Sequence, residues 1–286
     1  MNSINSKSAS LFVVATPIGN LDDISRRALQ VLKEVDLVAA EDTRHSRKLL
    51  TYFGLEKRLI SLHEHNERDK TQRLLEKLEA GQSIALVSDA GTPLISDPGY
   101  PLVNECRMRG IEVIPVPGPS AVITALSVSG LPTDSFLFCG FPPRQPGKRR
   151  ELFESLKNNT ATLVFYESSH RITDCLDDAL AVFGHDRIAC VARELTKLYE
   201  TVKTGTLNDL LDFVSSDPDQ QKGEFVLMIQ GISQAEKQDD VAIDVDKLLL
   251  ALLEELPVKK AASITSKMTG HKKNELYQRA LELKEK

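Results

Sequence analysis

The sequence predicts an α/β fold with two α/β domains and a small C-terminal helical domain. Short apolar runs alternate with stretches of helical spacing, a pattern typical of parallel or mixed sheets with helices on their faces. The chain has 286 residues, which is long for a single hydrophobic core, so more than one domain is expected. Polar, glycine- or proline-containing segments follow several apolar runs, where α/β folds place their ligands.

Five apolar runs in the first part of the chain predict strands. They cover residues 11–15, 35–40, 59–62, 83–88 and 111–115. A helix is expected to begin at Asp22 or Asp23, and another to carry Leu74, Leu75 and Leu78. Prolines hold the stretch 115–119 extended, which favours a domain boundary there. We therefore expect an N-terminal α/β domain over residues 11–117.

The same alternation resumes after the prolines. Strands are expected at residues 135–139, 161–166, 187–192 and 224–229. Helices are expected at residues 120–128, 148–157 and 169–183, with a proline-rich loop at 141–147. This predicts a second α/β domain over residues 118–231 and a cleft between the two.

The two ends of the chain have a different character. Residues 1–10 are polar and predict a disordered leader, and residues 233–240 form a polar linker. An apolar helix at 248–253 stops at Pro257, and two further helical patterns are separated at Thr269-Gly270. We expect a helical domain of helix-turn-helix type over residues 241–286. Residues 258–286 carry eight Lys/Arg and three Glu, so this domain is either an RNA-contacting surface or a solvated one.

Composition narrows the function classes. The hydrophobic fraction is 41% and the charged fraction 27%, as in ordinary globular proteins, and the net charge of −5 gives no global nucleic-acid signature. No apolar run approaches the ~18 residues that span a bilayer. The four cysteines form no CxxC pair and are expected to be reduced, so we expect a cytoplasmic protein.

The segment 87–99, VSDAGTPLISDPG, is the most informative stretch. Asp89 follows a buried strand directly, and Gly91 would let a ligand approach the backbone. The residues alone leave open whether Asp89 caps the next turn or contacts a ligand. Asp97, in the second turn, is expected to cap a helix.

Four strand ends carry polar clusters: TPIGN, EDTRH, SDAGTP and ESSHR. Together they favour a ligand site in a cleft. TPIGN is no dinucleotide fingerprint, and the chain lacks a GxxxxGK[ST] phosphate loop and a GxSxG nucleophile motif. His63 and His65 have no metal-ligand spacing with their neighbours, so no metal is expected.

Read in order, these and other motifs resemble a known family. TPIGNLDDIS, AAEDTRHS, LHEHN, VSDAGTPLISDPG, PGPSA, FYESSHR and ARELTK are similar to the ribosomal RNA small-subunit methyltransferase I family, a branch of the tetrapyrrole (class III) methylases. The resemblance covers about residues 10–231, and LPVKKAA with KKNELY resembles the family's appended helix-turn-helix domain.

The resemblance implies an S-adenosylmethionine-dependent methyltransferase that modifies the ribose 2′-hydroxyl of a cytidine in the decoding centre of 16S rRNA, within the 30S subunit. It also implies a homodimer. Carried onto this chain, the cofactor-binding residues would be Pro17, Asp89, Gly91, Thr92, Pro93, Ser120, Ala121, Tyr166, Glu167, Ala192 and Arg193. Pro17 and Gly19 would face the methyl group and the acceptor. The first loop departs from the GxGxG of many tetrapyrrole methylases, which argues against a porphyrinoid substrate.

The catalytic residues are less defined. A ribose hydroxyl needs a proton acceptor, and the strand ends offer Glu41, Asp42, His45, His63, His65, Glu167 and Glu194. We hypothesise that Arg44 and Arg193 orient phosphate or ribose groups. The candidate catalytic set is therefore Arg44, His45, Glu167 and Arg193.

Two basic segments are candidates for RNA binding. Beside Phe141, four cations fall within seven residues: Arg144, Lys148, Arg149 and Arg150. They predict phosphate contacts and salt-dependent affinity, or else a charged helix start. Lys272 and Lys273 mark the second segment. The target nucleotide is expected to be splayed out of folded RNA into the cleft. A methylase for tetrapyrroles or other small molecules, and a non-catalytic RNA-binding assembly factor, are the alternatives.

Overall fold

The computed structural model describes residues 9–63, 66–233 and 245–284, and it divides into two compact units. One unit spans residues 1–156 and 161–230, and it contains two five-stranded sheets. The other spans residues 157–160 and 231–286, and its described residues form three helices. Most of the expected leader, all of the polar linker after Ser233, and Glu64 with His65 lie outside the described residues.

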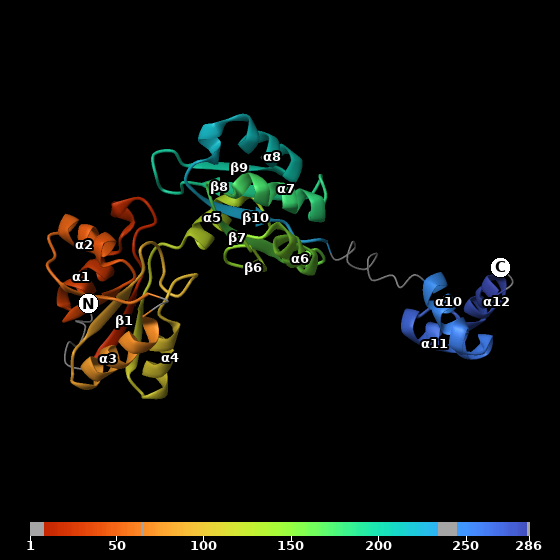
Figure 1. The fold of residues 1–286 in the computed structure, drawn as a ribbon, viewed down its shortest axis with the longest axis horizontal. Coiled ribbons are helices and arrows are strands. Elements are labelled where there is room, and N and C mark those ends of the chain that lie inside the picture. Colours follow the sequence, from red (N-terminus) through yellow and green to blue (C-terminus); the bar gives the residue numbers. More distant parts are fainter. Residues whose placement is uncertain (1–8, 64–65, 234–244, 285–286) are drawn as a thin grey trace. The chain divides into compact units, whose positions relative to one another are not determined.

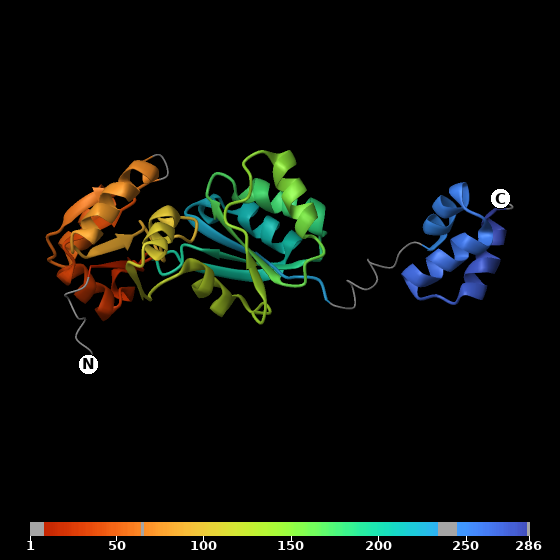
Figure 2. The ribbon, with the colours of Figure 1, turned by 90° about the horizontal axis from the view of Figure 1, so that it is seen from below.

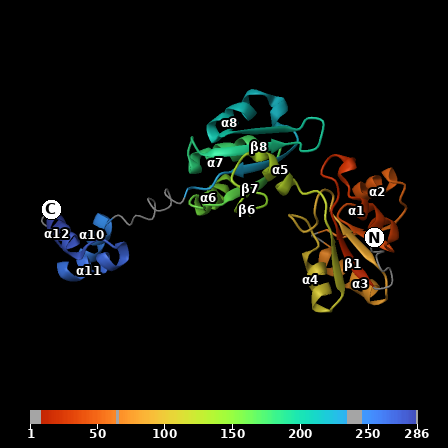
Figure 3. The same cartoon turned by 180° about the vertical axis from the view of Figure 1, so that it is seen from behind.

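The first sheet is wholly parallel, in the order β3-β2-β4-β1-β5. Its elements run in chain order as β1 (Ser10–Val14), α1 (Arg26–Glu34), β2 (Leu37–Ala40), α2 (Thr43–Tyr52), β3 (Arg58–Ser61), α3 (Glu67–Glu79), β4 (Ile84–Val87), α4 (Tyr100–Met108) and β5 (Glu112–Val116). Helices α1 and α2 pack on one face, and α3 and α4 on the other (Figure 1, Figure 3). Pro115 is accommodated because β5 lies at the sheet edge.

The second sheet is mixed, in the order β6-β7-β10-β8-β9. Its elements are α5 (Ala121–Ser129), β6 (Phe136–Phe138), α6 (Pro146–Leu156), β7 (Thr162–Ser168), α7 (Ile172–Phe183), β8 (Ile188–Arg193), β9 (Thr201–Thr206), α8 (Leu207–Ser216) and β10 (Glu224–Ile229). Helices α6, α7 and α8 cover one face and α5 the other (Figure 2). Since β10 runs antiparallel between β7 and β8, the carboxyl ends of β7 and β8 lie beside the start of β10.

The C-terminal unit is a bundle of α10 (Val245–Glu255), α11 (Val258–Thr269) and α12 (Lys273–Lys284). Leu249, Ala262, Leu276 and Ala280 form its small core. The break between the last two helices is at Gly270, which has a left-handed φ of 74°. Asp246 binds Arg279 and so joins the first helix to the last.

Several local expectations were wrong. The first helix begins at Arg26 and not at Asp22 or Asp23, because the Ser25 side chain caps it, and residues 21–23 form a separate 3₁₀ turn. Ser10, expected in the leader, is buried in β1. The proline-rich loop is shorter than expected, since α6 begins at Pro146. Helices α2, α4 and α8 and strand β9 were not expected.

Candidate functional site

One pocket collects most of the expected cofactor residues. It has a cavity volume of about 560 Å³, within the range of small-molecule sites. Asp89, Gly91 and Thr92 line it from the loop after β4, and Ser120 and Ala121 from the start of α5. Tyr166, Glu167 and Ala192 line it from the ends of β7 and β8. The two sheets therefore supply opposite parts of one pocket wall.

A backbone bridge fixes the loop after β4 against the loop after β1. Thr16 N donates to Gly91 O at 2.9 Å, and Gly91 N donates to Thr16 O at 3.1 Å. Gly91 has a φ of 82°, and a Cβ there would lie 3.3 Å from Ile18 Cγ2. Glycine is thus needed both for the turn and for the close contact.

Asp89 is a bridge between loops rather than a helix cap. Its Oδ1 accepts a hydrogen bond from Asp42 N at 3.0 Å, which ties the ends of β2 and β4 together. Oδ2 has no hydrogen-bond partner within the described part of the chain. Asp89 also lines the pocket, so one oxygen supports the loops while the other is available to a ligand.

Asp97 also lines the pocket, and the expectation that it caps a helix was wrong. Helix α4 has Gly99 at its N-cap and no side-chain cap, and Gly99 N donates to Glu67 Oε1 at 2.6 Å. Burial raises the pKa of Asp97 to about 6, a hydrogen bond from Ser88 opposes the rise, and the charge of Asp89 adds to it.

Aromatic rings form another part of the wall. The Tyr166 ring packs edge-on against Phe138 at a centroid distance of 4.9 Å, and against Phe141 at 5.5 Å. Burial raises the pKa of Tyr166 to about 12, so its hydroxyl stays protonated at neutral pH. Phe141 lines the pocket although its ring is 55% exposed. From the sequence, Phe141 was expected beside basic residues and not in the pocket.

The carboxylate of Glu167 makes its polar contacts with its own strand, β7, and with the N-cap residue of α7. Its side chain is fully buried, Oε1 accepts from Ser168 N at 2.8 Å, and Oε2 pairs with Arg171 Nη2 at 3.1 Å. The geometry makes Glu167 an anchor for Arg171 in the pocket wall.

Comparison with known proteins agrees with this architecture. The model of the Tetrapyrrole (Corrin/Porphyrin) Methylases matches residues 10–211, and that of the RsmI C-terminal HTH domain matches residues 239–284. The chain is 50% identical over 280 residues to "Ribosomal RNA small subunit methyltransferase I" of Escherichia coli O157:H7, covering 98% of this chain and 97% of that protein. The chain belongs to the ribosomal RNA small subunit methyltransferase I family.

Other matches show how far the likeness extends. The protein of the same name from Xylella fastidiosa is 52% identical over 269 residues, covering 94% of this chain and 97% of the relative. The crystal structure of uroporphyrin-III-C-methyltransferase from Thermus thermophilus matches with a TM-score of 0.54 at 21% identity, covering 78% of this chain and 94% of that one. The structural match shows that this chain shares its fold with that enzyme over 78% of its length.

Three expected cofactor residues lie outside the pocket wall. Pro17 and Pro93 are buried in the loops that support it. Arg193 is 7% exposed, and its guanidinium donates from Nε to Lys222 O at 2.6 Å and from Nη1 to Tyr199 O at 3.0 Å. The expected role of Arg193 in orienting phosphate or ribose is therefore corrected: it joins two loops behind the pocket.

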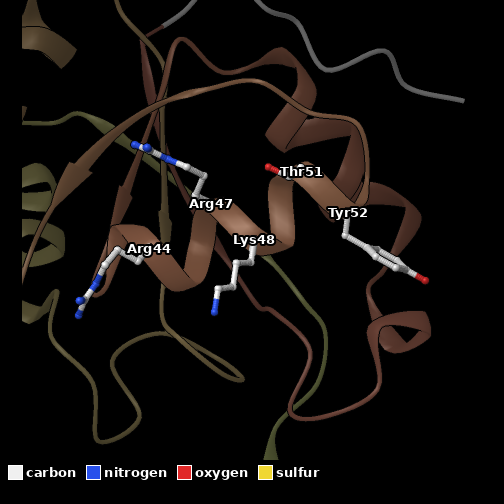
Figure 4. Close-up of a pocket in the computed structure, with 5 residues that line it drawn as sticks. All are labelled: Arg44, Arg47, Lys48, Thr51 and Tyr52. Atoms are coloured by element: carbon white, nitrogen blue, oxygen red, sulfur yellow. The ribbon is translucent and has the colours of Figure 1, made fainter.

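Arg44 and His45 also lie outside the pocket, on the exposed side of α2. Arg44 pairs with Asp42 at 3.0 Å, and it lines a separate, shallow hollow with Arg47, Lys48, Thr51 and Tyr52 (Figure 4). Figure 4 shows these side chains pointing in different directions from the helix. The catalytic role expected of Arg44 and His45 has no support in this placement. Glu41, which precedes α2, does line the pocket.

The basic segment of α6 divides into exposed and buried members. Arg144, Lys148 and Arg150 are exposed, whereas Arg149 is 2% exposed and its Nε donates to Asp178 Oδ2 at 2.6 Å. The expectation that Arg149 contacts RNA was wrong, because its guanidinium is buried against α7. In the C-terminal unit Lys272 and Lys273 are exposed.

The pocket offers negative charge beside apolar surface. Asp89 and Asp97 are among its carboxylates and complement a positively charged ligand, and Ile18, Ala121 and Phe225 offer apolar surface. Among the described residues no group of three His, Cys, Asp or Glu could hold a metal ion. None of the helices described is both long and apolar enough to cross a membrane.

Proposed function

We propose that this chain transfers a methyl group from S-adenosylmethionine to the ribose 2′-hydroxyl of a cytidine in the decoding centre of 16S rRNA. The observation that carries the proposal is the pocket with acidic and apolar walls, in a chain half identical over nearly its full length to proteins named for small-subunit rRNA methylation. We further propose that the protein acts in the cytoplasm on the 30S subunit, as a homodimer.

The cofactor residues in this proposal are Asp89, Gly91, Thr92, Ser120, Ala121, Tyr166, Glu167 and Ala192. Bound S-adenosylmethionine would supply an electrophilic methyl group on a sulfonium. Asp89 and Asp97 place negative charge in the wall, which favours a cationic ligand. Thr92 is held by its hydroxyl, which donates to Pro119 O at 3.1 Å and so joins the loop after β4 to the start of α5.

The chain's main contribution to catalysis is positioning. An in-line displacement requires donor and acceptor in fixed register, and the bridge between Thr16 and Gly91 holds the loops after β1 and β4, which form one part of the pocket wall, in fixed positions. The acceptor hydroxyl must lose a proton. Asp97 lines the pocket with a pKa of about 6, close to working pH, and we assign it the role of proton acceptor.

The RNA would be held by the exposed cations Arg144, Lys148 and Arg150 near the pocket, and by Lys272 and Lys273 in the C-terminal unit. Such contacts contribute affinity that falls with salt. Replacing Arg144, Lys148 and Arg150 together with Ala is expected to weaken RNA binding and flatten its salt dependence, with cofactor affinity unchanged.

The test is one labelling experiment. The purified protein is incubated with tritiated S-adenosylmethionine and either 30S subunits, naked 16S rRNA or a porphyrinoid, and labelled RNA is mapped with nucleases. Label on a single cytidine ribose supports the proposal. Label on a base or on the porphyrinoid would overturn it, and binding of RNA without any label would indicate a non-catalytic assembly factor.

A further inference from the structure

The loop after β6 carries an exposed aromatic ring at the pocket. Phe141 is 55% exposed and still lines the pocket, so its ring lies at the mouth. An exposed phenyl ring leaves apolar surface in contact with water, which favours its coverage by a ligand. Tyr166 covers part of it, at a centroid distance of 5.5 Å. The rest is open to an incoming group.

The backbone around Phe141 is held in place. Gly140, with a φ of 65°, turns the chain, and its carbonyl accepts from Tyr166 N at 2.9 Å. Pro142 and Pro143 follow, and their rings fix φ. Arg171 Nη2 donates to Pro142 O at 2.6 Å and to Pro143 O at 3.3 Å.

The same guanidinium connects this loop to the pocket floor. Arg171 Nη2 lies 3.1 Å from Glu167 Oε2, and the Glu167 side chain is fully buried. One arginine therefore ties the loop that bears Phe141 to a residue of the pocket wall. A ring that is exposed on a fixed backbone is organised for contact with a flat partner.

The neighbouring charges indicate what kind of partner this is. Arg144 and Lys148 are exposed and lie within seven residues of Phe141. Exposed cations close in the chain to an open aromatic ring match the way in which proteins bind single-stranded nucleic acid, by phosphate contacts and base stacking. A porphyrinoid would also stack, but its carboxylates would not require cations spread along a helix start.

We propose that Phe141 is a stacking platform for the unstacked base of the acceptor nucleotide at the mouth of the pocket, and that Arg171 positions the loop that carries it. This inference rests on the proposed function and adds the residue that receives the base. Stacking on a phenyl ring is tolerant of base identity, so Phe141 contributes to binding rather than to sequence choice.

The test compares Phe141→Ala, Phe141→Trp and Phe136→Ala. Phe136 is a matched control, since it is a phenylalanine on β6 with 42% exposure that does not line the pocket. Phe141→Ala is expected to lower kcat/KM for 30S subunits by about 5- to 100-fold, mainly through KM, whereas Phe141→Trp keeps it within about threefold of wild type. Phe136→Ala is expected to match wild type.

Two further readouts separate stacking from other roles. The Kd for S-adenosylmethionine, by calorimetry, is expected to stay within about twofold in Phe141→Ala. The fluorescence of a cytidine analogue in a short RNA hairpin is expected to be quenched by wild type and Phe141→Trp and not by Phe141→Ala.

Unchanged kcat/KM in Phe141→Ala would overturn the proposal. So would an equal loss of cofactor affinity, which would assign the ring to the cofactor. Failure of the wild-type protein to label any RNA would instead refute the proposed function.

Discussion

The buried cluster of Asp178, Arg149 and Arg150 gives the sharpest test of how α6 and α7 are joined. The side chains of Asp178 and Arg149 are each 3% exposed, and Arg149 Nε donates to Asp178 Oδ2 at 2.6 Å. Arg150 Nε donates to the other oxygen, Asp178 Oδ1, from a half-exposed position. Replacing Asp178 with Ala removes the acceptor of both.

The expected loss of unfolding free energy follows from the contacts that Arg149 would keep in Asp178→Ala. Arg149 would keep its charge in a buried site with one long hydrogen bond of 3.4 Å to Asp174 O. Breaking a buried ion pair by removing one partner costs about 3–5 kcal/mol. Arg150 adds little, because a half-exposed pair is screened by solvent. With about 2–4 °C per kcal/mol for a domain of this size, the melting temperature should fall by roughly 6–20 °C.

The assay is urea unfolding followed by circular dichroism, with calorimetry for the melting temperature. Asp177→Ala is the matched control, because Asp177 is exposed on the same helix, and it should change the unfolding free energy by less than about 0.5 kcal/mol. The double variant Arg149→Met, Asp178→Leu should recover most of the loss, since it removes both charges. A loss in Asp178→Ala no larger than in Asp177→Ala would refute the reasoning.

Three further predictions concern the pocket and the second sheet. The pKa of Asp97 is about 6 in the folded protein against an ordinary 3.8, so the wild-type protein should lose stability as pH rises from about 4 to 6. In urea unfolding, Asp97→Asn should match wild type near pH 4 and be the more stable protein above pH 6. The same variant should lose the acidic limb of the kcat–pH profile near pH 6. Gly91→Ala should destabilise the protein by about 1–2 kcal/mol or more, and also weaken S-adenosylmethionine binding by calorimetry. Gly54→Ala, which has a similar φ of 67° but open space around it, should show the backbone cost alone, and equal cofactor affinities in the two variants would contradict the assignment of the pocket. Thr206→Ala should lower the unfolding free energy by about 1 kcal/mol, because the Thr206 side chain caps α8, and no change in urea midpoint would argue against that capping box.

Except for β9, the strands of both sheets could be predicted from apolar runs, with boundaries shifted by at most two residues. The elements that were not predicted have only weak apolar patterns in the sequence. Helix α2 buries only Ser46 and Leu50, and α4 has Pro101 as its second residue, which is equally typical of a loop. Strand β9 is a partly exposed edge strand of sequence TVKTGT that pairs only with β8, so it has no apolar run to reveal it.

Part of the candidate site could also be predicted, because several of its residues lie at the ends of apolar runs. Asp89 and Gly91 follow the buried strand β4, and Tyr166 lies near the end of β7, and a strand's end can be located from its sequence. Arg193 also ends a strand, but its side chain is directed to two carbonyls whose positions depend on the loops around residues 199 and 222. Phe141 was recognised only as a neighbour of basic residues, because its place at the pocket depends on Tyr166 in another strand.

The alternation of strands and helices, the polar clusters at the strand ends and the likeness to an rRNA methyltransferase family could all be read from the sequence, because they depend on local spacing and residue type. Which of the polar side chains are exposed to solvent or to a ligand, and which are used in internal contacts, depends on the tertiary structure. Arg149 and Arg150 are adjacent in the chain, yet one is buried and the other exposed, because successive helical residues point in different directions and Asp178 lies on another helix. In the same way, one oxygen of Asp89 accepts a hydrogen bond from Asp42 N, 47 residues away in the chain, and this contact joins two loops at the pocket.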